Sequence, residues 1–164
     1  MYKRQVSGNG SSGTLSVSFT PKKNLKIVAY TKTSAGSARF RVGNGSLDSG
    51  NNYASRISSN GGSEDITTGI SGNSYTATTP IQWSMEITNI ADKEKLWISH
   101  LNRQSTAGVT NAPSRVEEYM KWANTSNQIN IVGFVCTDGS GTFSSDSYIT
   151  VYGAGSDVLS LIHI

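Results

Sequence analysis

The clearest hydrophobic pattern in the chain lies between residues 81 and 101. Apolar and polar residues alternate from Ile81 to Thr88, which is the period of a strand with one buried and one wet face. The segment from Leu96 to Leu101 carries apolar residues at both parities, which predicts a strand buried on both faces in the middle of a sandwich. Residues 89–95 between them are too charged to bury and predict a turn. This hairpin is the best core nucleus in the sequence, and it contains no recognisable catalytic motif.

Short strands separated by polar turns make up the rest of the chain. Alternating patterns predict strands at 15–19, 25–31, 39–42, 129–136 and 148–153. The polar passage 43–80 holds weaker strand patterns at 53–57, 66–70 and 75–79. A structureless loop of that length is unusual in a compact domain, so part of the passage is expected to be edge strand. The pattern as a whole predicts an all-β, antiparallel two-sheet sandwich with jelly-roll topology.

Segment 115–123 has two interpretations. Val116, Tyr119 and Met120 fall at helical spacing, and a proline at 113 is a suitable helix start. Read as a strand, Val116 and Met120 share one face with Glu118. The strand is preferred because helix start and stop signals are missing from the rest of the chain.

The alternating faces also predict the centre of the core. Large apolar residues that recur at every second position are expected to pack between the two sheets. On the strand 129–136, the face with Ile131 and Val135 is expected to point inward. The predicted core therefore contains Trp83, Met85, Ile87, Ile98, Ile131 and Val135.

The two ends differ in character from the rest. Residues 159–164, Leu-Ser-Leu-Ile-His-Ile, resemble a translated sequencing-adapter end, and residues 1–5 resemble the opposite strand of the same adapter. Such processing scars are set aside in reasoning about a fold. The expected domain is therefore a single sandwich over residues 6–158, with 1–5 and 159–164 contributing nothing to it. An ordinary terminus with an apolar tail is the alternative.

Composition narrows the class of protein. The chain has 14 basic and 11 acidic residues, and setting aside Lys3 and Arg4 leaves 12 against 11. So weak a positive charge argues against a nucleic-acid partner. No apolar run is long enough to span a membrane. Abundant Ser, Thr, Gly and Asn suit an extracellular or virion surface, and the lone Cys136 excludes a disulfide framework or a cysteine-rich zinc site.

A set of short motifs points to a family. In chain order they are Phe40-Arg41-Val42, Asn51-Asn52-Tyr53, Met85-Glu86-Ile87, Lys121-Trp122-Ala123-Asn124-Thr125-Ser126-Asn127-Gln128-Ile129, Gly139-Ser140-Gly141 and Val151-Tyr152-Gly153. The set resembles β-sandwich proteins of marine phages, archaeal viruses and metagenomes that are regarded as virion structural or tail-associated proteins. The resemblance covers most of residues 40–153. It implies a place in the virion and contacts with further copies and with other virion proteins, and it brings no catalytic residues.

Candidate catalytic and metal-binding residues are sparse. His100 is the only histidine outside the suspected adapter tail, and it has no obvious partner on its strand. Glu117 and Glu118 are adjacent, so on a strand they point to opposite faces and cannot act as a pair. Asp48, with asparagines at 44, 51 and 52, offers oxygen ligands that calcium accepts, but turn formation explains these residues equally well. We predict no metal, no cofactor and no enzymatic activity.

Aromatic residues are the remaining candidates for a binding site. Tyr53, Tyr75 and Trp97 are the predicted glycan-contacting set. Two functions follow: a non-catalytic virion component (fibre, tail-tip or capsid-decoration domain) that mediates assembly or host-surface attachment, or a carbohydrate-binding module of a surface protein or hydrolase. An exposed apolar patch on the sandwich favours the first. A shallow groove lined by coplanar aromatic rings with Asn or Asp at its edge favours the second.

Overall fold

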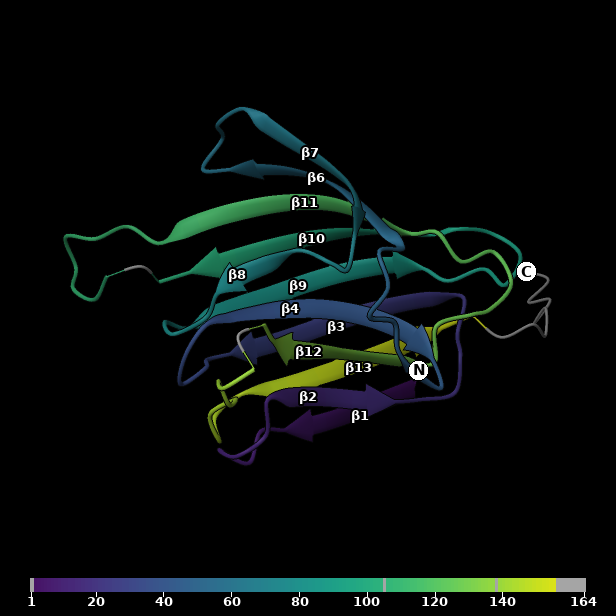
Figure 1. The fold of residues 1–164 in the computed structure, drawn as a ribbon, viewed down its shortest axis with the longest axis horizontal. Coiled ribbons are helices and arrows are strands. Elements are labelled where there is room, and N and C mark those ends of the chain that lie inside the picture. Colours follow the sequence, from purple (N-terminus) through teal and green to yellow (C-terminus); the bar gives the residue numbers. More distant parts are fainter. Residues whose placement is uncertain (1, 105, 138, 156–164) are drawn as a thin grey trace, which may run out of the picture.

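A computed structural model describes residues 2–104, 106–137 and 139–155. Figure 1 shows the described residues as strands without a helix. The strands are β1 (Tyr2–Ser7), β2 (Thr14–Ser18), β3 (Asn24–Thr31), β4 (Ser37–Asn44), β5 (Ser46–Leu47), β6 (Tyr53–Ser59), β7 (Glu64–Ile70), β8 (Ser74–Thr76), β9 (Ile81–Thr88), β10 (Lys95–Arg103), β11 (Ser114–Trp122), β12 (Ile131–Cys136) and β13 (Tyr148–Ala154).

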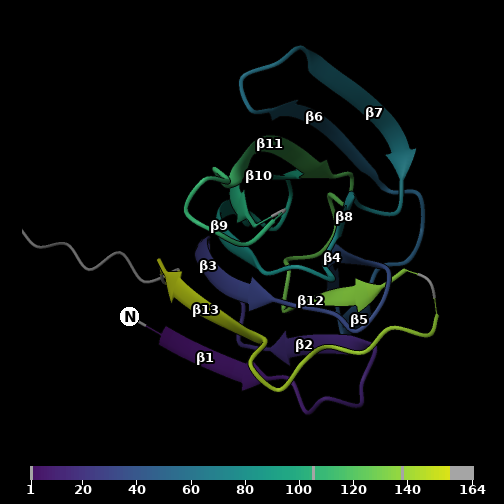
Figure 2. The same cartoon turned by 90° about the vertical axis from the view of Figure 1, so that its left-hand side faces the viewer.

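The strands form two antiparallel sheets that pack face to face, which confirms the predicted sandwich. One sheet has eight strands in the order β1-β13-β3-β9-β10-β11-β6-β7, and the other has the order β2-β12-β4-β5, with β8 paired to β4. The chain passes repeatedly from one sheet to the other, as it does in jelly rolls. Figure 2 shows the larger sheet bending around the smaller one, with β6 and β7 at its far end.

The β9–β10 hairpin lies at the centre of the larger sheet, as its pattern predicts. β9 pairs with β3 on one side and β10 pairs with β11 on the other. The turn is wrongly predicted to be wholly exposed, because its end residues Asn89 and Lys95 are fully buried. The Lys95 ammonium donates hydrogen bonds to the carbonyl oxygens of Ala91, Lys93 and Asn124, which uses all three of its protons. Burial lowers the pKa of Lys95.

The segment with two interpretations is strand β11. Residues 114–122 pair with β10 on one side and with β6 on the other, so the strand interpretation is confirmed. Val116, Glu118, Met120 and Trp122 are buried on its inner face, as the strand pattern requires.

Half of the predicted core is confirmed. Trp83, Met85 and Ile87 on β9 are each at most 3% exposed. Ile98 is wrongly predicted, because it is 42% exposed on the far side of β10. β10 buries the opposite parity, since the large Trp97 and Leu101 fill the space between the sheets.

Strand β12 is also turned over relative to the prediction. Ile131 and Val135 are only partly buried, whereas Val132 and Phe134 are fully buried. The ring of Phe134 lies 4.8 Å from the ring of Trp83, measured between centroids. Both parities of β12 are apolar, so aromatic packing across the sandwich decides which face points inward.

The N-terminal residues belong to the sheet. β1 pairs with β13 from Tyr2 opposite Gly153 to Ser7 opposite Tyr148. The expectation that residues 1–5 lie apart from the fold is therefore wrong for residues 2–5, which form an edge strand. Residues 159–164 lie outside the described part of the chain.

Candidate functional site

The side of the eight-stranded sheet that points away from the smaller sheet reaches solvent. The strands β3, β9, β10 and β11 alternate between buried and exposed or half-exposed residues, and we call the solvent side of their sheet the outer face. Strand register aligns one residue from each central strand across this face: Lys26, Glu86, Ile98, Tyr119 and Arg56. The outer face is therefore a regular surface on which neighbouring side chains from distant segments meet.

An apolar cluster projects from the middle of the outer face. Leu96 is 56% exposed, Ile98 is 42% exposed and Tyr119 is 49% exposed. Ile98 faces Tyr119 across the β10–β11 pair, and Leu96 lies two residues before Ile98 on the same side. We call these three residues the Ile98 patch. Clustered exposed apolar side chains of this kind mark interaction surfaces more often than single ones do.

Ion pairs surround the Ile98 patch. Lys26 Nζ lies 2.6 Å from Glu86 Oε1, and Lys121 Nζ lies 2.8 Å from Glu94 Oε2. Beyond Tyr119, the Arg56 guanidinium pairs with the carboxylate of Glu64 on β7. The hydrogen bond and charge of Lys26 lower the pKa of Glu86. Such surface pairs contribute little stability, but they give the patch a rim that is polar and balanced in charge.

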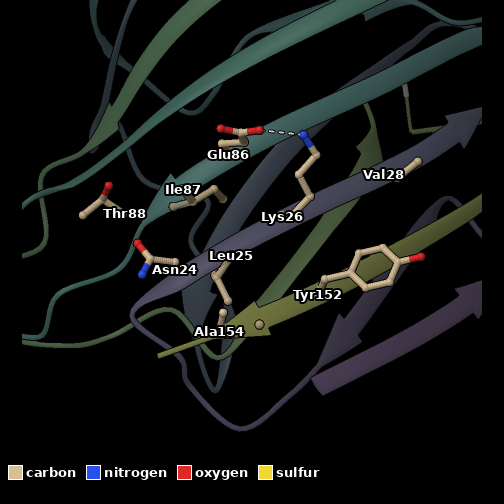
Figure 3. Close-up of a pocket in the computed structure, with 10 residues that line it drawn as sticks. Asn24, Leu25, Lys26, Val28, Glu86, Ile87, Thr88, Tyr152 and Ala154 are labelled. Carbon is tan, nitrogen blue, oxygen red and sulfur yellow. Dashed lines mark hydrogen bonds and ion pairs between the residues drawn. The ribbon is translucent and has the colours of Figure 1, made fainter. Parts of the chain in front are cut away.

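A hollow adjoins the patch on the same face. It has a volume of about 610 Å³ and lies over β13, β3 and β9, between Tyr152 and the Lys26–Glu86 pair (Figure 3). Glu86 is the cross-strand neighbour of Ile98, so the hollow and the Ile98 patch share a border. The lining is largely apolar, which suits an apolar side chain presented by another molecule.

Two of the predicted glycan-contacting residues lie in the core. Trp97 is 3% exposed and Tyr53 is 2% exposed, and their rings pack edge to face with centroids 6.2 Å apart. The Tyr53 hydroxyl donates to the Val42 carbonyl oxygen at 2.9 Å, and burial raises the pKa of Tyr53. Their prediction as a surface site is wrong, because both residues lie at inward parities, where Trp97 also contacts Phe40.

The third predicted residue, Tyr75, is half-buried and belongs to a different cluster. Its ring packs edge to face on Trp83 at 5.5 Å, and its hydroxyl donates to Glu118 Oε1 at 3.2 Å. Asn73 donates a second hydrogen bond to the same oxygen. The structure therefore brings Tyr53 and Trp97 together and leaves Tyr75 apart from them.

Glu118 is a carboxyl group buried in the sandwich. It is 2% exposed, and burial raises its pKa although the hydrogen bonds from Asn73 and Tyr75 act in the opposite direction. Ser99 lies opposite it across the β10–β11 pair. A buried carboxyl group whose pKa is raised by desolvation resembles a catalytic acid. Among the described residues, however, no group of three His, Cys, Asp or Glu side chains could hold a metal beside it.

Three N–H groups hold the carboxylate of Asp48 in the loop that follows β5. Asp48 accepts hydrogen bonds from the Trp122 indole at 2.7 Å, from the Asn52 amide at 2.9 Å and from the Gly50 backbone at 2.8 Å. Burial opposes ionisation, but these donors outweigh it and lower the pKa of Asp48. A carboxylate whose oxygens already accept three N–H groups is suited to closing a turn, and the turn interpretation of this loop is the one the geometry favours.

The run from Trp122 to Ile129 is tied down by a buried asparagine. The Asn89 side chain donates to the carbonyl oxygens of Lys22 and Ile129, both at 3.0 Å, and accepts from the Ile129 backbone N–H at 2.7 Å. Asn124 turns the chain by accepting from two following backbone N–H groups. These contacts give the run a structural role at one end of the sandwich.

Reasoning from the sequence did not predict the Ile98 patch, although the sequence contains a signal for it. Leu96 and Ile98 stand at the parity opposite to Trp97, and their apolar character was attributed to burial on both sides. An apolar residue at the solvent parity of a central strand is equally the signature of a contact surface.

His100 on the same side of β10 is exposed, as expected of a surface histidine. The described residues contain no helix that is long and apolar enough to cross a membrane.

Comparison with models of known protein families, with curated proteins and with solved structures finds no match to this chain.

Proposed function

We propose that this protein is a non-catalytic structural component of a virion, such as a fibre, tail-tip or capsid-decoration domain, that assembles with copies of itself through the outer face. The observation that carries the proposal is the Ile98 patch beside an apolar hollow on one exposed face. A surface with an apolar centre and a charged rim has the anatomy of a protein–protein interface.

A second copy of the chain is the occupant that this surface fits. An interface related by a two-fold axis uses the same surface on both partners, so it must be complementary to itself. A two-fold axis through the Ile98 patch packs the patch of one copy against the patch of the other, and it brings the neighbouring apolar hollow of each copy into the same contact. The rim of the patch holds both signs of charge in equal number: Lys26 with Glu86, Lys121 with Glu94, and Arg56 with its partner on β7.

Composition and sequence resemblance support a virion setting. The chain is rich in neutral polar residues and poor in charge, at 15% charged residues. The motifs between residues 40 and 153 resemble β-sandwich virion proteins, and an extracellular position on the particle agrees with that composition. Contacts with other virion proteins belong to the same proposal.

The absence of catalytic activity is proposed on the arrangement of titratable groups. Glu118 is buried beneath Asn73 and Tyr75, and the residues that touch it donate hydrogen bonds rather than accept protons. General acid–base chemistry needs a titratable group within reach of a substrate. The acids of the outer face are paired with basic side chains: Glu86 with Lys26, Glu94 with Lys121 and Glu117 with Arg115.

The mass of the protein in solution tests the proposal. Light scattering across a concentration series should give a multiple of the 17.5 kDa chain mass for the wild type. Ile98→Glu buries a charge in the centre of the interface, so the assembly should dissociate. Val109→Glu is the matched control, because Val109 is fully exposed in a loop away from the patch. An Ile98→Glu protein that assembles like the wild type would contradict the proposal.

A further inference from the structure

A second feature of the outer face lies beyond the Ile98 patch, toward the C-terminal end of β10. Strand register places Tyr148, Tyr30, Gln82 and Asn102 side by side on four successive strands, β13, β3, β9 and β10. Together with Pro80 and Gln104 they line a groove of about 310 Å³. Asn102 follows Ile98 by four positions along β10, which is about 13 Å in an extended strand. We call this feature the tyrosine groove.

Two aromatic rings form one side of the tyrosine groove. The rings of Tyr30 and Tyr148 are 16° from parallel, with centroids 6.3 Å apart. Because both tyrosines are only partly buried, some of their ring surface is accessible to another molecule. Both side chains are half-buried, and their positions are fixed by the β13–β3 pairing. The rings are therefore held in place before any ligand arrives, which lowers the entropic cost of binding.

Unused hydrogen-bonding groups form the other side. The side-chain amides of Gln82, Asn102 and Gln104 are exposed, and no hydrogen bond joins them or the two tyrosine hydroxyls to another residue that the structure describes. Elsewhere in the fold the amides of Asn52 and Asn89 bond within the protein. The groove thus presents free donors and acceptors next to aromatic faces.

We propose that the tyrosine groove is a binding site for a neutral carbohydrate. The positively polarised C–H groups of a sugar ring suit the negative face of an aromatic ring, and amide and phenol groups suit hydroxyls that both donate and accept. The side chains that line the groove are uncharged, and Arg115, opposite Asn102 on β11, is paired with Glu117, so the groove favours a neutral ligand over a phosphate or a uronic acid. Its row of four strands, about 4.8 Å apart, is about 14 Å across and accommodates more than one sugar residue.

The position of the groove separates this inference from the assembly proposal. The groove and the Ile98 patch occupy different rows of the outer face, so sugar binding does not depend on the patch. Loss of one property leaves the other measurable: mass in solution reports the patch, and titration with oligosaccharides reports the groove.

Calorimetric titration of the full chain tests the inference, with cellohexaose, laminarihexaose and chitohexaose as neutral probes. At least one of them should bind, and Tyr30→Ala or Tyr148→Ala should weaken that binding about tenfold, the equivalent of one aromatic contact. Tyr148→Phe keeps the ring and should retain most of the affinity. Tyr2→Ala is the control, because Tyr2 is a partly buried tyrosine on the edge strand outside the groove.

Three outcomes would overturn the inference. The first is that none of the three neutral probes binds. The second is that binding survives both Tyr30→Ala and Asn102→Ala; the exposed Asn102 also provides the test should the tyrosine variants fail to fold. The third is that an alginate hexamer or a dT oligonucleotide binds in place of the neutral sugars, since that would show the groove to be a site for anions.

Discussion

Replacing the buried Asn89 with alanine tests whether the run from Trp122 to Ile129 is structural. The substitution removes three hydrogen bonds, two to carbonyl oxygens at 3.0 Å and one from the Ile129 N–H at 2.7 Å. The backbone groups of Asn89 keep their own bonds to Lys23 and Gln128. Each lost bond costs about 1 kcal/mol, and more where the buried partner stays unpaired, so the free energy of unfolding should fall by about 3–5 kcal/mol.

Urea denaturation at fixed pH and temperature measures this loss. The midpoint should fall while the dependence on urea concentration stays constant, because the surface exposed on unfolding is unchanged. Asn111→Ala is the matched control: Asn111 is exposed and makes one side-chain bond, to the Ala107 carbonyl, so its loss should stay within about 0.5 kcal/mol. If Asn89→Ala costs no more than that control, the reasoning is refuted and the run is free to serve a binding role.

Two further substitutions test the interior of the sandwich. Burial raises the pKa of Glu118 above its ordinary value of 4.5. Well below pH 4.5 the carboxyl group is protonated in both the folded and the unfolded state, so it does not affect stability. As the pH rises above 4.5 the unfolded state releases the proton more readily than the folded state does, so stability is lost. Glu118→Gln should raise the free energy of unfolding at pH 8 and change it little at pH 4, measured against the half-exposed Glu117→Gln; an equal effect at both pH values would contradict this. Trp83→Ala should lower the free energy of unfolding by about 3–5 kcal/mol, measured by chemical denaturation, whereas Ile98→Ala should lower it much less because Ile98 is exposed. Equal losses would show that the buried and exposed faces of β9 and β10 are wrongly assigned.

The sequence predicts most strands of this fold because a period of two is a local property. The alternation in 81–88 and 25–31 is visible without any knowledge of neighbouring strands, and both segments are strands in the structure. Strand orientation is harder where both parities are apolar. In β12 the choice between Val135 and Phe134 depends on packing against Trp83, which lies on a distant segment.

Buried polar residues were beyond sequence reasoning for the same physical reason. Lys95 is charged, and local composition places it in an exposed turn. Its burial is tolerated because carbonyl oxygens converge on the ammonium, and one of them comes from Asn124 on another segment. Glu118 was correctly placed on the face of Val116, but its partner Tyr75 lies far away in the chain.

The candidate sites depend on register, which a single sequence does not reveal. Tyr30 and Tyr148 meet only because β13 pairs with β3, although they are far apart in the chain. Ile98 and Tyr119 likewise meet through the β10–β11 pairing. Tyr53 was predicted to contact a glycan because it lies in a polar passage, and Trp97 because it shares its strand face with Ser99; both are buried in the core.

Cysteine cross-linking at the Ile98 patch tests the central claim most directly. In an interface with two-fold symmetry, residues near the axis contact the same residues of the other copy. The native Cys136 is buried, so a cysteine introduced at Ile98 would be the reactive one. Ile98→Cys should form a covalent dimer of the 17.5 kDa chain under mild oxidation, and Val109→Cys in its exposed loop should not. Equal cross-linking at both positions, or none at Ile98→Cys, would contradict assembly through the outer face.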